Sequence, residues 1–242
     1  MVFRWAPGRP ERTQTYRVEA RPGMTVLDAL VEIQRSQGPT LAFRYACRVG
    51  MCGSCAMVVN GRERWACRTL LASLGSDAVS VRPLYHFPLI RDLVVDMAPF
   101  ATKMKAVGAA FVPKGGQETF APIGRATKER QQIDPAVECI GCGMCLSACT
   151  MVRWDTNFAG PAALNRAFTL QADSRDGAGA ERWPLLLSEE ALFRCHGQAN
   201  CTEVFPMELS PTDSILKLRR KSIFQQVKSP HRLDTSRAAV LA

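Results

Sequence analysis

The sequence predicts an α+β protein of two domains, the first rich in β-strands and the second mainly helical. Short segments that alternate apolar with polar residues fill the first third of the chain, as half-buried strands do. Helix start signals stand between the cysteines of the second half. A stretch rich in Gly, Pro, Lys and Gln separates the two parts. We therefore expect a first domain at 1–104, a linker at 105–134 and a second domain at 135–242.

The first domain begins with two expected strands, 2–6 and 14–20, on either side of a turn. Thr25-Val-Leu-Asp28 is a capping box that predicts the start of a helix, and Gly38-Pro39 predicts its end. Residues 78–83 are expected to close the sheet, and 90–98 to form a helix.

Four cysteines follow the first predicted helix. Cys47, Cys52 and Cys55 have the C-x4-C-x2-C spacing of plant-type 2Fe–2S proteins, and Cys67 supplies a distant fourth thiolate. Asn60-Gly61 predicts a tight hairpin turn between strands at 56–59 and 64–67. Strand, strand, helix and cysteine loop in this order are typical of a β-grasp ferredoxin. The first domain is therefore predicted to be one.

The second domain contains two cysteine runs in the same register. Cys139, Cys142, Cys145 and Cys149 form a C-x2-C-x2-C-x3-C run, in which three thiolates hold one cube-type cluster and the fourth serves another. The partner run has Cys195 and Cys201, with Gln198 and Phe205 in its other two ligand positions. A zinc ribbon or a disulfide framework is the alternative, but a zinc ribbon needs two C-x2-C pairs and no cysteines at these further offsets.

The remaining helix signals surround these runs. Gly160-Pro161 predicts a helix through Ala172, residues 188–192 predict a helical approach to Cys195, and Ser210-Pro-Thr-Asp213 predicts a capped helix. Together with the cysteine spacing, they predict an all-α helical ferredoxin domain.

Net charge, cysteine usage and hydrophobic runs narrow the classes of function that are possible. The net charge is +9, but the arginines are spread along the chain without a nucleic-acid-binding motif, so no nucleic acid partner is expected. All ten cysteines fall in the spacing patterns above, which favours metal binding in a reducing compartment. We expect neither a signal peptide nor a transmembrane segment, because no apolar run approaches ~18 residues.

This arrangement resembles the iron–sulfur subunit of succinate dehydrogenases and fumarate reductases, over roughly residues 2–225. The matching segments are Phe43-Arg44 through Cys67, 91–96, 160–162, 173–176 and 193–196. The resemblance implies an electron-transfer subunit of an oxidoreductase complex, with no substrate-converting site of its own. It implies an FAD-containing flavoprotein partner, membrane-anchor subunits and a quinone. The subunit would lie at the cytoplasmic side of the inner membrane, or in the cytoplasm.

When the family's ligand positions are carried over to this chain, the resemblance assigns its cysteines to three clusters. Four cysteines match the 2Fe–2S ligands: Cys47, Cys52, Cys55 and Cys67. Three match the 3Fe–4S ligands: Cys149, Cys195 and Cys201. Three match ligands of the family's 4Fe–4S cluster: Cys139, Cys142 and Cys145. Trp154 and His196 match positions near the family's quinone pocket.

The chain departs from the family at Phe205, where the fourth 4Fe–4S ligand should stand, at Thr150 and at Arg153. The third cluster could then be 3Fe–4S, could be 4Fe–4S with water or an oxygen such as Glu203 on its odd iron, or could be absent. We favour 3Fe–4S, because phenylalanine excludes water and offers no ligand. Two other functions stay open: a free ferredoxin-like shuttle, and an enzyme whose open iron at the Phe205 position acts as a Lewis acid.

Overall fold

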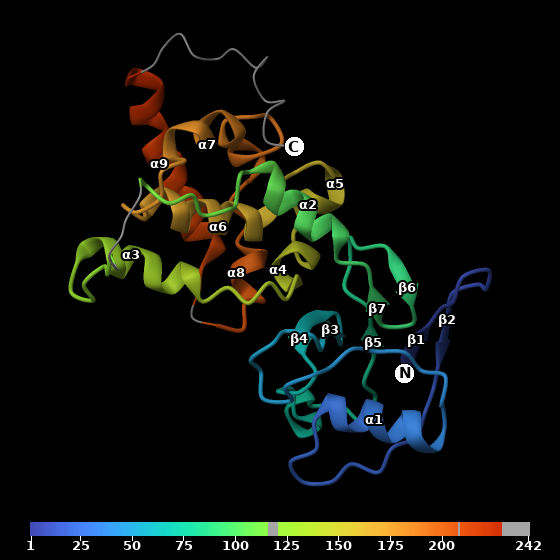
Figure 1. Ribbon diagram of the computed structural model, residues 1–242. Coiled ribbons are helices and arrows are strands. Elements are labelled where there is room, and N and C mark those ends of the chain that lie inside the picture. The colour runs from blue at the N-terminus through green and yellow to red at the C-terminus, as the bar shows by residue number, and fades with distance from the viewer. Residues whose placement is uncertain (116–120, 208, 229–242) are drawn as a thin grey trace. The chain divides into compact units, whose positions relative to one another are not determined.

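The computed structural model describes residues 1–115, 121–207 and 209–228 (Figure 1). Its contacts divide the chain into two compact units. The first unit consists of Met1–Pro99 and Ile140–Ala148, and the second of Phe100–Cys139 and Cys149–Ala242. The first unit thus includes a short segment from near the start of the second predicted domain. Residues 229–242, the end of that predicted domain, lie outside the described residues.

The first unit is built on a five-stranded sheet in the order β2-β1-β5-β3-β4. Its strands are β1 (Val2–Arg4), β2 (Arg12–Gln14), β3 (Ala56–Val59), β4 (Arg62–Trp65) and β5 (Val81–Arg82). The central strand, β5, runs parallel to β1, with Val2 opposite Val81, and antiparallel to β3. The segment at 78–83 thus joins the sheet as expected, although only two of its residues are strand.

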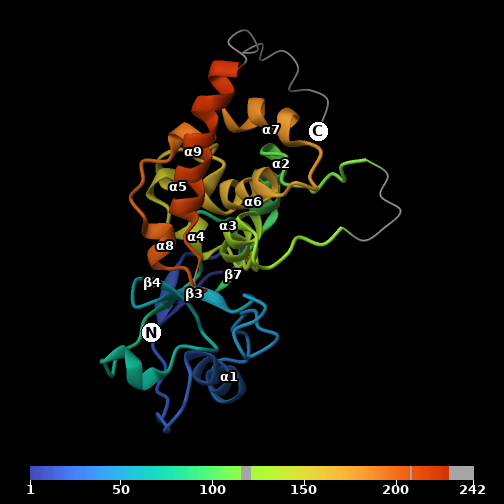
Figure 2. The ribbon, with the colours of Figure 1, turned by 90° about the vertical axis from the view of Figure 1, so that its left-hand side faces the viewer.

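Helix α1 (Val26–Ser36) lies against this sheet (Figures 1 and 2). The predicted capping box is present: the Thr25 hydroxyl accepts from the Asp28 N–H, and the Asp28 carboxylate accepts from the Thr25 N–H. Leu27, Leu30 and Ile33 bury the apolar face of the helix. The helix ends before Gly38, as predicted.

Three expected boundaries in the first unit need correction. The first strand, expected at 2–6, is β1 at Val2–Arg4. The second strand is β2 at Arg12–Gln14 and not 14–20, because Tyr16 instead turns its hydroxyl toward the Arg4 guanidinium. The hairpin around Asn60-Gly61 is present, with both residues at positive φ, but its returning strand ends at Trp65. Cys67 therefore lies in a turn just past β4.

The helix expected at 90–98 is wrong. The chain forms a hairpin of β6 (Leu89–Arg91) and β7 (Val94–Val95), and helix α2 (Ala98–Ala106) begins only afterwards. The turn residue Asp92 has φ 45° and a buried carboxylate. That carboxylate accepts hydrogen bonds from the Arg4 side chain and from the N–H groups of Trp5 and Ala42. These distant donors hold the segment in a turn, since a buried carboxylate must be paired.

The second unit is helical. Its longer helices are α2, α3 (Lys128–Val137), α6 (Gly160–Ala172), α7 (Gly179–Leu186) and α9 (Pro211–Lys228). Short helices carry or adjoin the cysteines: α5 (Thr150–Trp154), η2 (Leu192–Arg194) and α8 (Asn200–Glu203). Helix α6 is buried along most of its length and packs against both α3 and α9 (Figure 2). It forms the core of this unit.

Helix α6 confirms the start predicted at Gly160-Pro161 and the end at Ala172. The helix expected at 188–192 is wrong: α7 ends at Leu186, where the Ser188 hydroxyl bonds back to the Leu185 carbonyl, and the 3-10 turn η2 precedes Cys195. Helix α9 starts at Pro211, and the Ser210 hydroxyl accepts from the Asp213 N–H as predicted.

The segment predicted as a linker contains the end of α2 and most of α3. Its residues after α2 are held by Arg182, which is buried in the second unit. The Arg182 guanidinium donates to the carbonyls of Gly108 and Ala110 and pairs with both oxygens of Asp176 at 3.1 Å. Residues 116–120 lie outside the described residues.

Candidate iron–sulfur centres

The loop from Cys47 to Cys55 has a backbone that folds inward on its own sulfur atoms. Arg48, Gly50 and Gly53 all have positive φ, between 60° and 79°. The Met51 N–H donates to the Cys47 sulfur at 3.3 Å. A side chain at Gly50 would collide with Arg68, 2.9 Å from its added Cβ. The positive φ values and the Met51 N–H together fold the loop backbone around the Cys47 sulfur, and Gly50 leaves room for Arg68 beside it.

The structure brings the four thiols of the first set into one group. Burial raises the pKa of Cys55 to about 12, with the neighbouring Cys67 and Cys52 thiols adding to the rise. The pKa of Cys52 is lowered to about 6, by the Ser54 hydroxyl and then by Cys47. The Ala66 N–H also donates to the Cys55 carbonyl at 3.1 Å, which places Cys55 beside the turn that carries Cys67. The two parts of the predicted ligand set thus lie together, as a shared cluster needs.

A second set consists of Cys149, Cys195 and Cys201, all in the second unit. Burial raises the pKa of Cys149 and of Cys201, and each of these thiols is also affected by the charge of Cys195. The Gly197 N–H points at the Cys195 sulfur at 3.4 Å, and the Thr212 hydroxyl lies 3.5 Å from the Cys201 sulfur. Three far-separated cysteines thus converge, as a cluster needs.

Two cations near this second set were not foreseen from the sequence. Arg219 of α9 donates to the carbonyls of Leu192 and Cys195, so it ties the ligand turn to the helix. Lys103 of α2 donates to the Phe158 carbonyl, and its pKa is lowered by burial, against the opposing charges of Asp155 and Cys149. Neither residue belongs to a motif, so only the three-dimensional structure reveals them.

The two ligand runs of the second unit are also joined by a side-chain bond. The Thr150 hydroxyl, next to Cys149, donates to the side-chain oxygen of Gln198. Gln198 occupies the ligand position that holds no cysteine. This bond satisfies the amide oxygen and keeps Gln198 in a polar role at the edge of the site.

The third set is Cys139, Cys142 and Cys145. Cys142 and Cys145 are buried in the first unit, at and just inside the start of α4 (Met144–Ser147), while Cys139 ends the preceding segment of the second unit. Phe205 is half-buried and Glu203 is exposed. The ligation of this set stays a prediction from spacing.

The two quinone candidates are exposed. Trp154, the last residue of α5, has 83% of its surface accessible, and His196 directly follows Cys195 in an exposed turn. Both residues therefore belong to the same unit as the Cys149 set, and both adjoin a cysteine run in the sequence.

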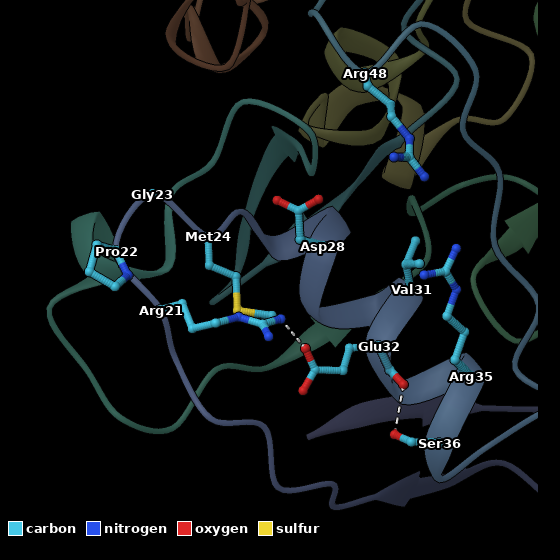
Figure 3. A pocket seen from close by; sticks show the side chains of 10 residues that line it. All are labelled: Arg21, Pro22, Gly23, Met24, Asp28, Val31, Glu32, Arg35, Ser36 and Arg48. Carbon is cyan, nitrogen blue, oxygen red and sulfur yellow. Dashed lines mark hydrogen bonds and ion pairs between the residues drawn. The ribbon is translucent and has the colours of Figure 1, made fainter.

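A depression of about 650 Å³ beside α1 is lined by Arg21, Asp28, Glu32, Arg35 and Arg48 (Figure 3). Arg21 pairs with Glu32 across it, and no cysteine lines it. Among the described residues, no three His, Cys, Asp or Glu side chains are placed to ligate one metal ion. Thiolates around a sulfide-bridged core with several irons lie further apart than those around a single ion, so the thiol sets fit clusters better.

Fold and thiol sets together define an iron–sulfur protein with a β-grasp domain and a helical cluster domain. Residues 1–102 match the family model described as "2Fe-2S iron-sulfur cluster binding domain", and residues 135–209 match "4Fe-4S dicluster domain". The chain is 34% identical to the succinate dehydrogenase [ubiquinone] iron-sulfur subunit, mitochondrial, of Candida glabrata, over 92% of this chain and 90% of that protein.

A solved structure supports the same relationship. A chain of the Mycobacterium smegmatis Sdh1 complex in the apo form superposes with a TM-score of 0.85 at 30% identity, covering 93% of this chain and 95% of that one. The protein therefore belongs to the family of succinate dehydrogenase iron–sulfur subunits.

Family membership confirms the predicted resemblance, fold class and role. The chain is an electron-transfer subunit of an oxidoreductase complex of the succinate dehydrogenase and fumarate reductase type. Subunits of this family carry 2Fe–2S, 4Fe–4S and 3Fe–4S clusters, and work with a flavoprotein subunit and membrane-anchor subunits. The free shuttle and the Lewis-acid enzyme are not favoured. Such subunits are peripheral to a membrane-associated complex, and no described helix of this chain is long and apolar enough to span a bilayer.

Proposed function

We propose that this chain passes electrons from the reduced flavin of a succinate-oxidising flavoprotein to a quinone through three clusters. The 2Fe–2S cluster takes Cys47, Cys52, Cys55 and Cys67, and a 3Fe–4S cluster takes Cys149, Cys195 and Cys201. The observation that carries the proposal is that backbone and side-chain contacts bring the ligand segments of each set together. The Ala66 N–H donates to the Cys55 carbonyl at 3.1 Å beside Cys67, and the Thr150 hydroxyl donates to Gln198 between the Cys149 and Cys195 segments. When bound, the clusters supply one-electron carriers; the chain supplies their ligands and spacing.

The choice of succinate as substrate and of a quinone as acceptor rests on the Candida glabrata relative, whose name specifies a ubiquinone-linked succinate dehydrogenase. The test is to purify the complex with its flavoprotein and add succinate anaerobically. Reduction of the clusters in this chain by succinate, and their reoxidation by a quinone, is expected. Reduction of the flavin alone, with the clusters remaining oxidised, would contradict the proposal. Fumarate consumption driven by a reduced quinone, without succinate oxidation, would favour the reverse direction.

We also propose that the third cluster, at Cys139, Cys142 and Cys145, is trinuclear. The support is Phe205: the ligand position in the partner run holds an apolar ring, and all other cysteines are assigned. The variant Phe205→Cys should gain one iron and lower the potential of this cluster, because a fourth thiolate adds negative charge. Phe205→Leu, which offers no ligand, is the matched control. An unchanged iron content in Phe205→Cys would favour a cube that is already complete.

For the electron exit, we propose that the quinone binds near the Cys149 set, against Trp154 and His196. Their exposure and their closeness in sequence to ligand cysteines support this. His196→Asn should slow quinone reduction several-fold while leaving reduction of an artificial dye by the flavoprotein intact. Loss of both activities to the same degree would give His196 a structural role instead.

We also propose that the chain is a peripheral subunit at the cytoplasmic side of the membrane.

A further inference from the structure

Gly53 lies at a close approach between two ligand segments of the first unit. It stands between the ligands Cys52 and Cys55, with φ +70°. A Cβ added at Gly53 would lie 2.5 Å from the Cys142 Cβ and 3.0 Å from the Cys142 Cα. Both distances are shorter than van der Waals contact, and the atoms are next to or part of the backbone. The backbone at Gly53 therefore touches Cys142 directly, and no other residue fits there.

The segment that carries Cys142 is fixed to the first unit by buried polar contacts. The Ser147 hydroxyl donates to the Glu63 carboxylate at 2.7 Å and accepts from the Tyr85 N–H at 2.9 Å. Ser147 and Glu63 are both buried. Because a buried carboxylate is costly to leave unpaired, this pair holds α4 against β4. Cys142 is thus held at a set distance from the 2Fe–2S loop.

Apolar packing fixes the same segment from another direction. Gly143 begins α4 with φ +81°, and a Cβ there would come within 3.1 Å of the Phe87 ring and 3.2 Å of the Met97 methyl group. Met144 and Leu146 are buried. The segment Ile140–Ala148 is therefore a packed part of the first unit, which also carries the whole 2Fe–2S ligand set.

We propose that the contact of Gly53 with Cys142 is where an electron passes from the 2Fe–2S cluster to the cluster ligated by Cys142, and that Gly53 is a positioning residue for this step. The proposal rests on the cluster assignments proposed above. The step moves one electron: the reduced 2Fe–2S cluster is oxidised and the neighbouring cluster is reduced, with no bond made or broken. The reductant is the reduced flavin of the flavoprotein, or dithionite in the isolated chain.

The physical reason is the steep fall of electron tunnelling with distance. The route from one cluster to the other runs through Cys52 or Cys55, the Gly53 backbone, one van der Waals contact, and Cys142. A methyl group at position 53 forces these two segments apart, because neither the loop backbone nor the Cys142 backbone can rotate away. A larger gap weakens both the tunnelling rate and the magnetic interaction between the clusters.

The test compares Gly53→Ala with Gly50→Ala in the full chain with its clusters. Gly50 also has a positive φ in the same loop, so alanine strains the backbone at both positions. A methyl group at Gly50 meets Arg68 and Trp65, however, and not Cys142. The two variants therefore share the strain and differ in the contact.

The readout is the electron paramagnetic resonance signal of the 2Fe–2S cluster in fully reduced protein. A paramagnetic neighbour speeds its relaxation, so the microwave power that half-saturates the signal reports the distance between the clusters. We expect the half-saturation power to be several-fold lower in Gly53→Ala than in Gly50→Ala, because only the first methyl group meets Cys142. A wild-type value in an iron-replete Gly53→Ala protein, or an equal fall in both variants, would overturn the proposal.

Ser147→Ala covers the case in which Gly53→Ala does not assemble its 2Fe–2S cluster. It loosens α4 without touching the 2Fe–2S loop, and should lower the half-saturation power less, with all clusters retained. Thr69→Ala is its control, because Thr69 is also a buried hydroxyl of this unit and bonds only to the Trp65 carbonyl. If Ser147→Ala matches wild type, the proposal is wrong. If wild-type protein itself lacks the 2Fe–2S signal, the cluster assignment fails first.

Discussion

The loop from Cys47 to Cys55 and the run from Cys195 to Phe205 arrange their ligands in different ways. In the first, the shape comes from the loop itself, through three separate residues at positive φ, Arg48, Gly50 and Gly53, and an N–H directed at a ligand sulfur. The second run also has positive φ, at Gly197 and Ala199, and an N–H directed at the Cys195 sulfur. Two of its ligand positions lack cysteine, however, and its turn is held in addition from outside by Arg219 of α9. A locally determined site can be recognised from spacing alone, whereas one supported by a distant helix cannot.

Removing a ligand from the local site should have the largest effect. Cys67→Ala takes away the thiolate that joins the turn after β4 to the cysteine loop. We expect complete loss of the 2Fe–2S signal and a less stable first unit, because cluster binding contributes folding free energy. The other two clusters should persist. Iron analysis and electron paramagnetic resonance measure both.

Ser54→Ala is the control for this loss. Its hydroxyl bonds to Cys52 but ligates nothing, so the cluster should remain with a changed potential. Retention of a two-iron signal in Cys67→Ala would mean that the fourth ligand is another residue.

The buried pair of Arg182 and Asp176 tests how far the second unit depends on distant contacts. Both side chains are almost fully buried, at 1% and 0% exposure. Arg182→Leu should lower the free energy of unfolding by about 3–5 kcal/mol, because it leaves the Asp176 carboxylate buried without its partner. Chemical denaturation of the anaerobic full chain, followed with the 2Fe–2S signal as an internal reference, measures the change.

Arg175→Leu is the matched control. Arg175 also pairs with an aspartate, Asp173, but is about one-third exposed, so its loss should cost about 1 kcal/mol or less. Equal destabilisation by the two variants would show that the burial of the Arg182 pair is not what stabilises the unit.

The smallest effect is expected for a substitution of Arg219. Arg219→Met keeps the aliphatic part of the side chain but removes the donors to the Leu192 and Cys195 carbonyls. We expect faster loss of iron from the Cys195 cluster on exposure to oxygen, with the 2Fe–2S signal unchanged. Arg220→Met, at an exposed neighbouring position, should behave as wild type. Equal iron loss in both variants would contradict the support from α9.

The sequence predicted those elements whose causes are local. The helix at 26–36 follows from its capping box, and the hairpin at Asn60-Gly61 from its turn residues. The ligand sets expected from cysteine spacing stay predictions. The hairpin of β6 and β7 was mistaken for a helix, because the donors that hold Asp92 come from Arg4, Trp5 and Ala42, far away in the sequence. No local pattern contains that information.

The same limit applies to the candidate sites. Arg219 stands in a short basic run, Arg219-Arg220-Lys221, that matches no motif, and Lys103 also belongs to none. The contact of Gly53 with Cys142 joins two motifs that the sequence shows separately. Spacing predicts which residues bind a cluster, while the residues that set its distance and environment depend on the tertiary structure.

The division of the ten cysteines among three clusters is the central claim, and Mössbauer spectroscopy of anaerobically purified, isotope-enriched full chain tests it most directly. The account predicts one binuclear centre and two trinuclear centres, with the second trinuclear centre at Cys139, Cys142 and Cys145. A four-iron cube whose irons are all bound by cysteine would contradict it, because that cube would need a thiolate already assigned to another cluster.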